Sequence, residues 1–307
     1  MNNRNGAIKI RKLNVKKLFA TVIVGFVLLI ILIICIYNAI EENKRKEAAY
    51  EYSKEMAELQ EQERIAKEEE EKRKQILLEN KYNPLTADEF SRIDNIFNHS
   101  DTKRVFLTFD DGPTTQVTPF ILDLLKKEKI KANFFVLGSM VNRNPDLVKR
   151  EYEEGHYIAN HSYTHRYKDI YQNADTVLDE YNQTNEAIKK AVENPKFNSL
   201  IFRFPGGSTG GYYADIKSEA VQKLKENGIA SIDWNALTKD AEGAHSKESI
   251  MDNLRATSED KTSVVLLMHD ASDKILTYEA LPDVINYFRE KGYQFQTFFD
   301  AMGREVE

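Results

Sequence analysis

Cysteine is almost absent from the 307-residue sequence, which contains one, Cys35. A single cysteine cannot form an intramolecular disulfide, so a folded domain in this chain must rely on its hydrophobic core. Basic clusters are missing outside the N-terminal tail, and the net charge is −6. Both features argue against a nucleic-acid partner, which requires a concentrated basic surface. Gly112 stands alone after the first predicted strand, and this excludes a glycine-rich phosphate loop there.

Charge is missing from residues 18–36, whereas the tail before them, 1–17, has six basic residues and no acidic one. As a helix the apolar run would be roughly 28 Å long, close to the thickness of a bilayer's hydrocarbon core. We expect a single transmembrane anchor over 18–40, with tail 1–17 cytoplasmic and the rest exported. A cleaved signal peptide would have a shorter apolar region and a small-residue cleavage site. A lipoprotein signal ending at Cys35 would follow Ile34, which is too bulky for such a signal.

Glycine and proline are both absent from residues 41–80, where 22 of the 40 residues are charged. This composition predicts a solvated helix, and we expect a charged helical stalk over 41–82. Tyr52, Met56 and Leu59 have heptad-like spacing, but the next equivalent positions are glutamates, so a sustained coiled coil is not supported. We interpret the stalk as a spacer, with a partner-binding helix as the alternative. Pro84 and a polar stretch then predict a linker over 83–102.

From residue 103 to the end at 307, short apolar runs alternate with segments of helical periodicity. The expected strands are 105–109, 132–137, 157–160, 200–204, 229–234, 263–268 and 293–298. Helical segments include 117–128, 178–192, 215–227 and 281–291. This alternation predicts one α/β domain with about seven, largely parallel strands. Without a phosphate loop, we favour a distorted (β/α) barrel over an open, doubly wound sheet.

Polar residues that can do chemistry fall where the predicted strands end. They are Asp110 and Asp111 after the first strand, His161 after the third, Arg203 after the fourth, Asp240 beyond the fifth and His269 after the sixth. In a β/α barrel these positions share the rim on which active sites are built. We therefore expect one site that combines them.

The spacing of His161 and His165 suits a metal ion, because side chains four residues apart on a helical turn can reach one point. Asp111 would complete a set of two histidines and one carboxylate with open positions for water and substrate. Zinc is the default for such a set, although cobalt, nickel or iron would fit. The adjacent Asp110 could then take a proton from water.

Four motifs occur in a fixed order along residues 103–300. They are Thr108-Phe109-Asp110-Asp111-Gly112-Pro113, His161-Ser162-Tyr163-Thr164-His165, Arg203-Phe204-Pro205-Gly206-Gly207-Ser208 and Leu267-Met268-His269. Together they resemble the motif set of the polysaccharide deacetylases, the NodB-homology group of carbohydrate esterase family 4. The resemblance covers the whole predicted globular domain.

The resemblance implies a role for each matching residue. Asp110 would be the general base, Asp111, His161 and His165 would hold one divalent metal ion, and His269 would be the general acid. Arg203 would orient Asp110, and Asp240 would in turn hold Arg203. Pro205, Gly206, Leu267 and Trp234 would contact the substrate, with the N–H of Gly206 near the oxyanion.

The sequence departs from the family at the fourth motif, where many members have an Asp-Trp pair. Here Asp240 is followed by Ala241, and the single tryptophan lies earlier, in Asp233-Trp234. Asp233 therefore competes with Asp240 for the contact with Arg203. We favour Asp240, because Asp233 falls inside the fifth predicted strand.

These observations predict a membrane-anchored, metal-dependent hydrolase that removes N-acetyl groups from an extracellular polysaccharide. Peptidoglycan N-acetylglucosamine is the favoured substrate, because it is the nearest such polymer outside the membrane. A chitin-like polymer, an exopolysaccharide and acetylxylan are alternatives, and a catalytically silent wall-binding protein is a further one. An iron-dependent oxygenase could use the same ligand types but is usually built on a different barrel. The sequence does not determine the oligomeric state.

Overall fold

A single helix, α1 (Val15–Asn80), begins the part of the chain that the structure, a computed structural model, describes: residues 15–304. Residues 1–14 of the expected cytoplasmic tail therefore lie outside the described residues. The apolar stretch of α1 has a mean hydropathy of 3.0, and none of it is buried against other described residues. By length and composition it is the one described helix that could cross a membrane. Signal sequences have the same properties.

The charged half of α1 carries ion pairs between neighbouring turns. Arg64 bonds to Glu61 at 2.6 Å, and Lys46 bonds to Glu42 at 2.7 Å. Such exposed pairs stabilise a helix by a few tenths of a kcal/mol each. The chain divides into two units between Arg73 and Lys74, and we describe each by itself.

The second unit is built on a sheet in which all strand pairs are parallel. Its strands are β1 (Arg104–Asp110), β2 (Asn133–Val136), β3 (Tyr157–Asn160), β4 (Ile201–Phe202), β5 (Ala230–Ser231), β6 (Ala236–Leu237), β7 (Ser263–His269) and β8 (Gln294–Phe295). Seven of the eight strands follow the order β5-β4-β3-β2-β1-β7-β6, and the eighth, β8, pairs with the start of β1. The sequence did not predict β6, because its two apolar residues lie between the polar residues Asn235 and Thr238 and form no longer run.

The sheet curls because the two strands at the ends of its order, β5 and β6, are joined by four residues, 232–235. We call this connection the seam. Asn235 bridges it to β7, donating its N–H to the carbonyl of Val265 at 3.2 Å. The result is the distorted (β/α) barrel that the sequence predicted.

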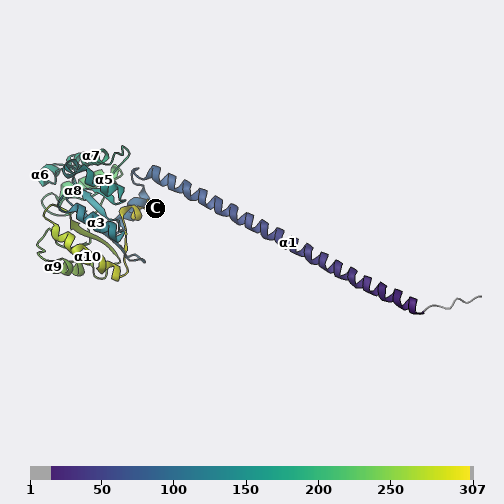
Figure 1. Ribbon diagram of the computed structural model, residues 1–307. Coiled ribbons are helices and arrows are strands. Elements are labelled where there is room, and N and C mark those ends of the chain that lie inside the picture. Colours follow the sequence, from purple (N-terminus) through teal and green to yellow (C-terminus); the bar gives the residue numbers. More distant parts are fainter. Residues whose placement is uncertain (1–14, 305–307) are drawn as a thin grey trace, which may run out of the picture. The chain divides into compact units, whose positions relative to one another are not determined.

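Helices surround the strands of this unit (Figure 1). They are α2 (Ala87–Asp94), α3 (Thr118–Glu128), α4 (Gly138–Arg143), α5 (Pro145–Glu153), α6 (Tyr167–Ile170), α7 (Ala174–Ala191), α8 (Ala214–Glu226), α9 (Lys247–Ser258), α10 (Ile275–Glu290) and α11 (Phe298–Met302). On β1, Val105, Leu107 and Phe109 pack in the core under the helices, while Phe106 packs in a second core with residues of the neighbouring strands. Because side chains alternate, Thr108 and Asp110 share the face of Phe106.

The segment 83–102, which we expected to be a linker, is part of the folded unit. Ile93 and Ile96 are fully buried, and α2 packs against α11. Thr86 and Glu89 form a capping box that starts α2, and Glu89 pairs with Arg304 at 2.5 Å. The Thr-x-x-Glu pattern was present in the sequence and is the signal that could have corrected the prediction.

Candidate active site

Asp110, the last residue of β1, is buried together with Arg203, which directly follows β4. The Nη1 of Arg203 donates to Oδ1 of Asp110 and to Oγ1 of Thr108, both at 2.8 Å. Burial raises the pKa of Asp110 above the ordinary carboxylate value, although the charge of Arg203 acts in the opposite direction. The structure thus confirms the expected contact between Arg203 and Asp110.

The remaining donors of Arg203 bond to the seam. Nε donates to the carbonyl of Ile232 at 3.2 Å, and Nη2 donates to the carbonyl of Asp233 at 2.9 Å. The guanidinium also lies 3.8 Å from the ring centroid of Phe135. Arg203 therefore links β1 to the seam, and its hydrogen bonds and ring contact hold the guanidinium in one orientation.

Asp111, His161 and His165 bring together three atoms that could hold a metal ion, all within 4.8 Å of one another. We call these three residues the metal-binding cluster. Oδ1 of Asp111 lies 3.5 Å from Nε2 of His161 and 3.3 Å from Nε2 of His165. This oxygen is buried and has no hydrogen-bond partner among the described residues. A buried, unpaired carboxylate oxygen is costly unless a cation completes it.

The protonation of His161 also suits a metal ligand. Its Nδ1 lies 2.8 Å from the carbonyl of Arg203, so Nδ1 carries the hydrogen and the lone pair of Nε2 is free. Burial lowers the pKa of His161 to about 3, against the attraction of Asp111, and keeps the ring neutral. Asp111, His161 and His165 thus fit a divalent metal ion in both position and chemistry.

Two residues of this cluster, and Ser162 beside them, have backbone conformations that non-glycine residues rarely adopt. The φ angles are 75° at Asp111, 71° at Ser162 and 58° at His165. Such conformations persist when surrounding contacts impose them, and they concentrate at functional sites. Asn160 supplies one such contact, because its Oδ1 accepts the N–H of Ser162 at 3.0 Å.

Glu180 of α7 holds the loop between the two histidines, a contact that the sequence did not predict. Its buried carboxylate accepts the N–H groups of Tyr163 and Thr164, both at 2.7 Å, and the hydroxyl of Thr164 at 3.0 Å. A glutamate on the inner face of an otherwise amphipathic helix was the available signal. Its partners, 16 and 17 residues away, depend on how α7 packs.

Asp270 lies beneath the acidic turn and was also missed. Its N–H donates to the carbonyl of Asp110 at 3.0 Å, and its carboxylate accepts a hydrogen bond from Thr118. A Cβ at Gly112 would lie 2.1 Å from this carboxylate, so a side chain cannot be accommodated there. Burial raises the pKa of Asp270 to about 7.

Asp240 contacts His269, which corrects our expectation that it holds Arg203. Its Oδ1 lies 2.9 Å from Nδ1 of His269, and its Oδ2 accepts the N–H of His269 at 2.7 Å. Thr277 donates to the same Oδ2 at 2.8 Å. The reason is topological, since β6 pairs with β7 and residues just beyond β6 lie beside the end of β7.

The alternative partner, Asp233, meets Arg203 through its backbone carbonyl and not through its carboxylate. The carboxylate instead accepts hydrogen bonds from the N–H and hydroxyl of Ser208, at 2.9 and 2.7 Å. Asp233 therefore ties the loop after β4 to the seam. Neither aspartate carboxylate forms an ion pair with Arg203 among the contacts of the described residues.

The interaction with Asp240 changes the acidity of His269. Burial by itself lowers the pKa of His269, but the hydrogen bond and charge of Asp240 outweigh it and raise the pKa to about 9. His269 is thus protonated at neutral pH. Its Nε2, which Asp240 does not contact, remains a donor.

The four residues expected to contact substrate lie at or near the same rim. Leu267 is buried on β7, and the carbonyl of Pro205 accepts the hydroxyl of Tyr171 at 2.7 Å. Gly206 has φ 75°, and a Cβ there would lie 2.4 Å from the hydroxyl of Tyr167. Trp234 lies next to Gly207, where a Cβ would be 3.6 Å from its ring.

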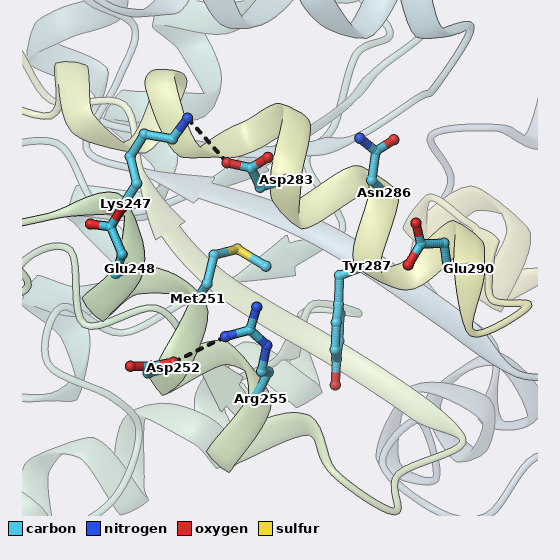
Figure 2. A pocket seen from close by; sticks show the side chains of 9 residues that line it. All are labelled: Lys247, Glu248, Met251, Asp252, Arg255, Asp283, Asn286, Tyr287 and Glu290. Carbon is cyan, nitrogen blue, oxygen red and sulfur yellow. Dashed lines mark hydrogen bonds and ion pairs between the residues drawn. The ribbon is translucent and has the colours of Figure 1, made fainter.

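A separate groove between α9 and α10, of about 650 Å³, is unrelated to this cluster (Figure 2). Its charges are mostly paired, with Lys247 on Asp283 at 3.1 Å and Arg255 on Asp252 at 3.0 Å. None of the residues that line it belongs to the strand ends described above. We therefore place the candidate active site at the metal-binding cluster.

Comparisons with known proteins agree with this placement. The family described as Polysaccharide deacetylase matches residues 98–231. A peptidoglycan-N-acetylglucosamine deacetylase of Bacillus cereus is 34% identical over 210 residues, 66% of this chain and 72% of that protein. The solved structure of a Streptococcus mutans CE4 esterase is 30% identical with a TM-score of 0.61, and the match covers 70% of this chain and 91% of that one.

A second solved structure is the catalytic domain of the peptidoglycan N-acetylglucosamine deacetylase of Eubacterium rectale. It is 30% identical with a TM-score of 0.58, and the match covers 65% of this chain and 92% of that one. The motif order, the barrel and the cluster of one aspartate and two histidines are thus accompanied by similarity over most of the second unit. The chain belongs to the polysaccharide deacetylases of carbohydrate esterase family 4, which are hydrolases of carbon–nitrogen bonds.

Proposed function

We propose that this protein removes the N-acetyl group from N-acetylglucosamine residues of peptidoglycan outside the cell membrane. The observation that carries the proposal is a pair of titratable side chains beside the metal-binding cluster, each of which has its own ionic partner. Asp110 is paired with Arg203, and His269 is paired with Asp240. One can accept a proton and the other can donate one, as amide hydrolysis requires.

Asp110 is the general base in this proposal. Its Oδ1 is occupied by Arg203, and its Oδ2 lies 3.7 Å from Nε2 of His161, beside the metal-binding atoms. Oδ2 would take a proton from the attacking water as the hydroxyl oxygen bonds to the acetyl carbon. A divalent ion held by Asp111, His161 and His165 would polarise the acetyl carbonyl and lower the pKa of water.

His269 is the general acid. When the carbon–nitrogen bond breaks, the protonated imidazole would give a proton to the departing nitrogen, so acetate and a free amine leave. The N–H of Gly206 would donate to the oxyanion, with Pro205 fixing the loop that carries it. Leu267 would contact the acetyl methyl, and Trp234 would form one side of the sugar site.

The choice of peptidoglycan rests on two further observations. The Bacillus cereus relative is a peptidoglycan-N-acetylglucosamine deacetylase. The apolar part of α1 is uncovered over its whole length among the described residues, and such a surface is stable in a lipid bilayer and not in water. We propose an uncleaved anchor over 18–40, a stalk after it, and a catalytic domain that begins before residue 83.

The metal in this proposal is zinc, the usual ion for two imidazoles and a carboxylate, although cobalt, nickel or iron would suit the same ligands. Elemental analysis of the purified protein would identify it. The three ligands predict about one equivalent of metal per chain.

Acetate release from several polymers tests the proposed reaction and substrate. Full-length protein in detergent should release acetate from peptidoglycan and from N-acetylglucosamine oligomers. Asp110→Asn should lose at least about 100-fold in kcat while retaining its metal content. Acetate release from acetylxylan without release from peptidoglycan would refute peptidoglycan as the substrate. Unchanged activity of Asp110→Asn would refute Asp110 as the general base.

A further inference from the structure

We propose that a row of tyrosines leading outward from the metal-binding cluster binds the sugar units next to the one that reacts. This tyrosine track consists of Tyr167, Tyr171, Tyr213 and Tyr212. The inference rests on the proposed function for the identity of the polymer. It adds a binding site beyond the reacting residue.

The track starts at a metal-binding residue and proceeds in short steps. The ring of Tyr167 is 6.0 Å from that of His165 and 5.7 Å from that of Tyr171. Tyr213 follows at 5.2 Å from Tyr171, and Tyr212 at 5.0 Å from Tyr213. These are contact distances for aromatic rings, so the row is continuous.

The inner part of the track is fixed by its surroundings. Tyr171 is buried, donates its hydroxyl to the carbonyl of Pro205 at 2.7 Å, and has Nζ of Lys217 5.1 Å from its ring. The loop that carries Tyr212 and Tyr213 follows β4, so it lies at the same edge of the sheet as Arg203. Because these contacts hold Tyr171, the rings that pack on it, Tyr167 and Tyr213, have fixed positions.

The two ends of the track are open to solvent. Tyr167 is 41% exposed, next to His165 and above Gly206, and Tyr212 is 95% exposed. Tyr212 contributes almost nothing to the core, because its ring contact is with Tyr213 at the surface. The ring of Tyr212 is therefore accessible to a ligand.

The chemistry of the track matches a pyranose ring. A sugar has a face of C–H groups bordered by hydroxyls, and a tyrosine has an apolar ring with a polar tip. Stacking of the two buries apolar surface on both while the hydroxyls remain hydrated. A polymer that places one unit at the metal-binding cluster would carry its next units toward Tyr212.

The dependence of activity and binding on oligomer length tests the track. Wild-type, Tyr212→Ala and Tyr212→Phe proteins are assayed on N-acetylglucosamine oligomers from the disaccharide to the hexasaccharide. Binding of the hexasaccharide is measured by titration calorimetry. Phe97→Ala is the matched control, because Phe97 is 40% exposed but precedes β1, at the opposite edge of the sheet.

We expect the ratio of kcat/KM for the hexasaccharide to that for the disaccharide to fall about fivefold in Tyr212→Ala, mainly through KM. The dissociation constant of the hexasaccharide should rise by a similar factor. Tyr212→Phe, which keeps the ring, should resemble wild type, as should Phe97→Ala. Circular dichroism melting establishes that all variants are folded.

The outcomes separate the track from the reaction. Tyr212-dependent binding without acetate release would refute the proposed function and leave the track. Acetate release with the same length dependence in wild type and Tyr212→Ala would refute the track and leave the reaction. Equal losses in Tyr212→Phe and Tyr212→Ala would also refute the track, because the stacking ring is retained in the first.

Discussion

Asp110 and Asp111 are neighbours in the chain with different surroundings. Asp110 points into the barrel, where Arg203 neutralises it, while Asp111 has turned out of the strand at φ 75° toward the two histidines. Without the turn, alternation would place the two side chains on opposite faces of the sheet. The unusual backbone therefore brings the proposed base and a proposed metal ligand to the same point.

Asp240 makes the pH dependence of the reaction testable. As the proposed acid, His269 must be protonated, so activity should persist up to about pH 9 and fall as the pH rises through that value. Asp240→Asn removes the charge that raises this pKa and leaves the effect of burial, which lowers it. The pH at which kcat/KM falls on the alkaline side should decrease by roughly two units or more.

The measurement is a pH–rate profile on an N-acetylglucosamine oligomer. Asp252→Asn, an exposed change of the same charge on α9, should leave the profile in place. An alkaline limb that stays near pH 9 in Asp240→Asn would contradict the assignment of His269 as the acid tuned by Asp240.

At the scale of elements, α7 supports the loop between His161 and His165. Glu180 accepts two backbone N–H groups of the segment between His161 and His165, so the loop conformation depends on its charge. Glu180→Gln replaces one acceptor oxygen by a donor and should weaken metal affinity about 10- to 100-fold, as changes beside metal ligands do. Competition with a chelator measures the affinity.

The matched control for Glu180→Gln is Glu186→Gln on the same helix. Glu186 pairs with Lys189 in solvent, and its side chain is 72% exposed. This variant should keep wild-type metal affinity. Equal affinities in wild type and Glu180→Gln would show that the loop holds its conformation without Glu180.

The helix α2 provides a second test at this scale. Ile93 is buried among residues of α11 and the barrel, so Ile93→Ala should lower the free energy of unfolding by about 2–4 kcal/mol. Trp234, the single tryptophan, reports unfolding by fluorescence in urea. Phe97→Ala should change stability by less than about 1 kcal/mol. If 83–102 were a linker, both variants would behave like wild type.

At the scale of the whole molecule, the question is whether α1 remains attached as an anchor. We expect the protein to fractionate with membranes, to resist a carbonate wash, and to keep the 35.5 kDa mass of the full chain. Ile30→Arg combined with Ile33→Arg places two charges in the apolar run and should release much of the protein from membranes. A shorter, soluble mature form would identify a cleaved signal sequence instead.

The sequence by itself determined the parts of this protein that depend on local pattern and on motif order. Apolar runs predicted seven of the eight strands, because even the two-residue strands β4, β5 and β8 lie inside longer apolar runs of the sequence. The spacing of His161 and His165 and the acidic turn predicted that these two histidines and Asp111 would lie together as a set that could hold a metal ion. The position at which each strand ends can be predicted from the local sequence. Because the strands are parallel, these ends lie on one rim.

Tertiary structure alone decided which polar groups meet. The partner of Arg203 at the seam is a pair of backbone carbonyls, and carbonyls carry no sequence signal. Asp240 meets His269 because β6, two residues long, pairs with β7. Glu180 reaches its loop through the packing of α7, and a row of ring contacts connects Tyr212 to Tyr167. Contacts between residues far apart in the chain depend on strand order and on curvature, which no local pattern encodes.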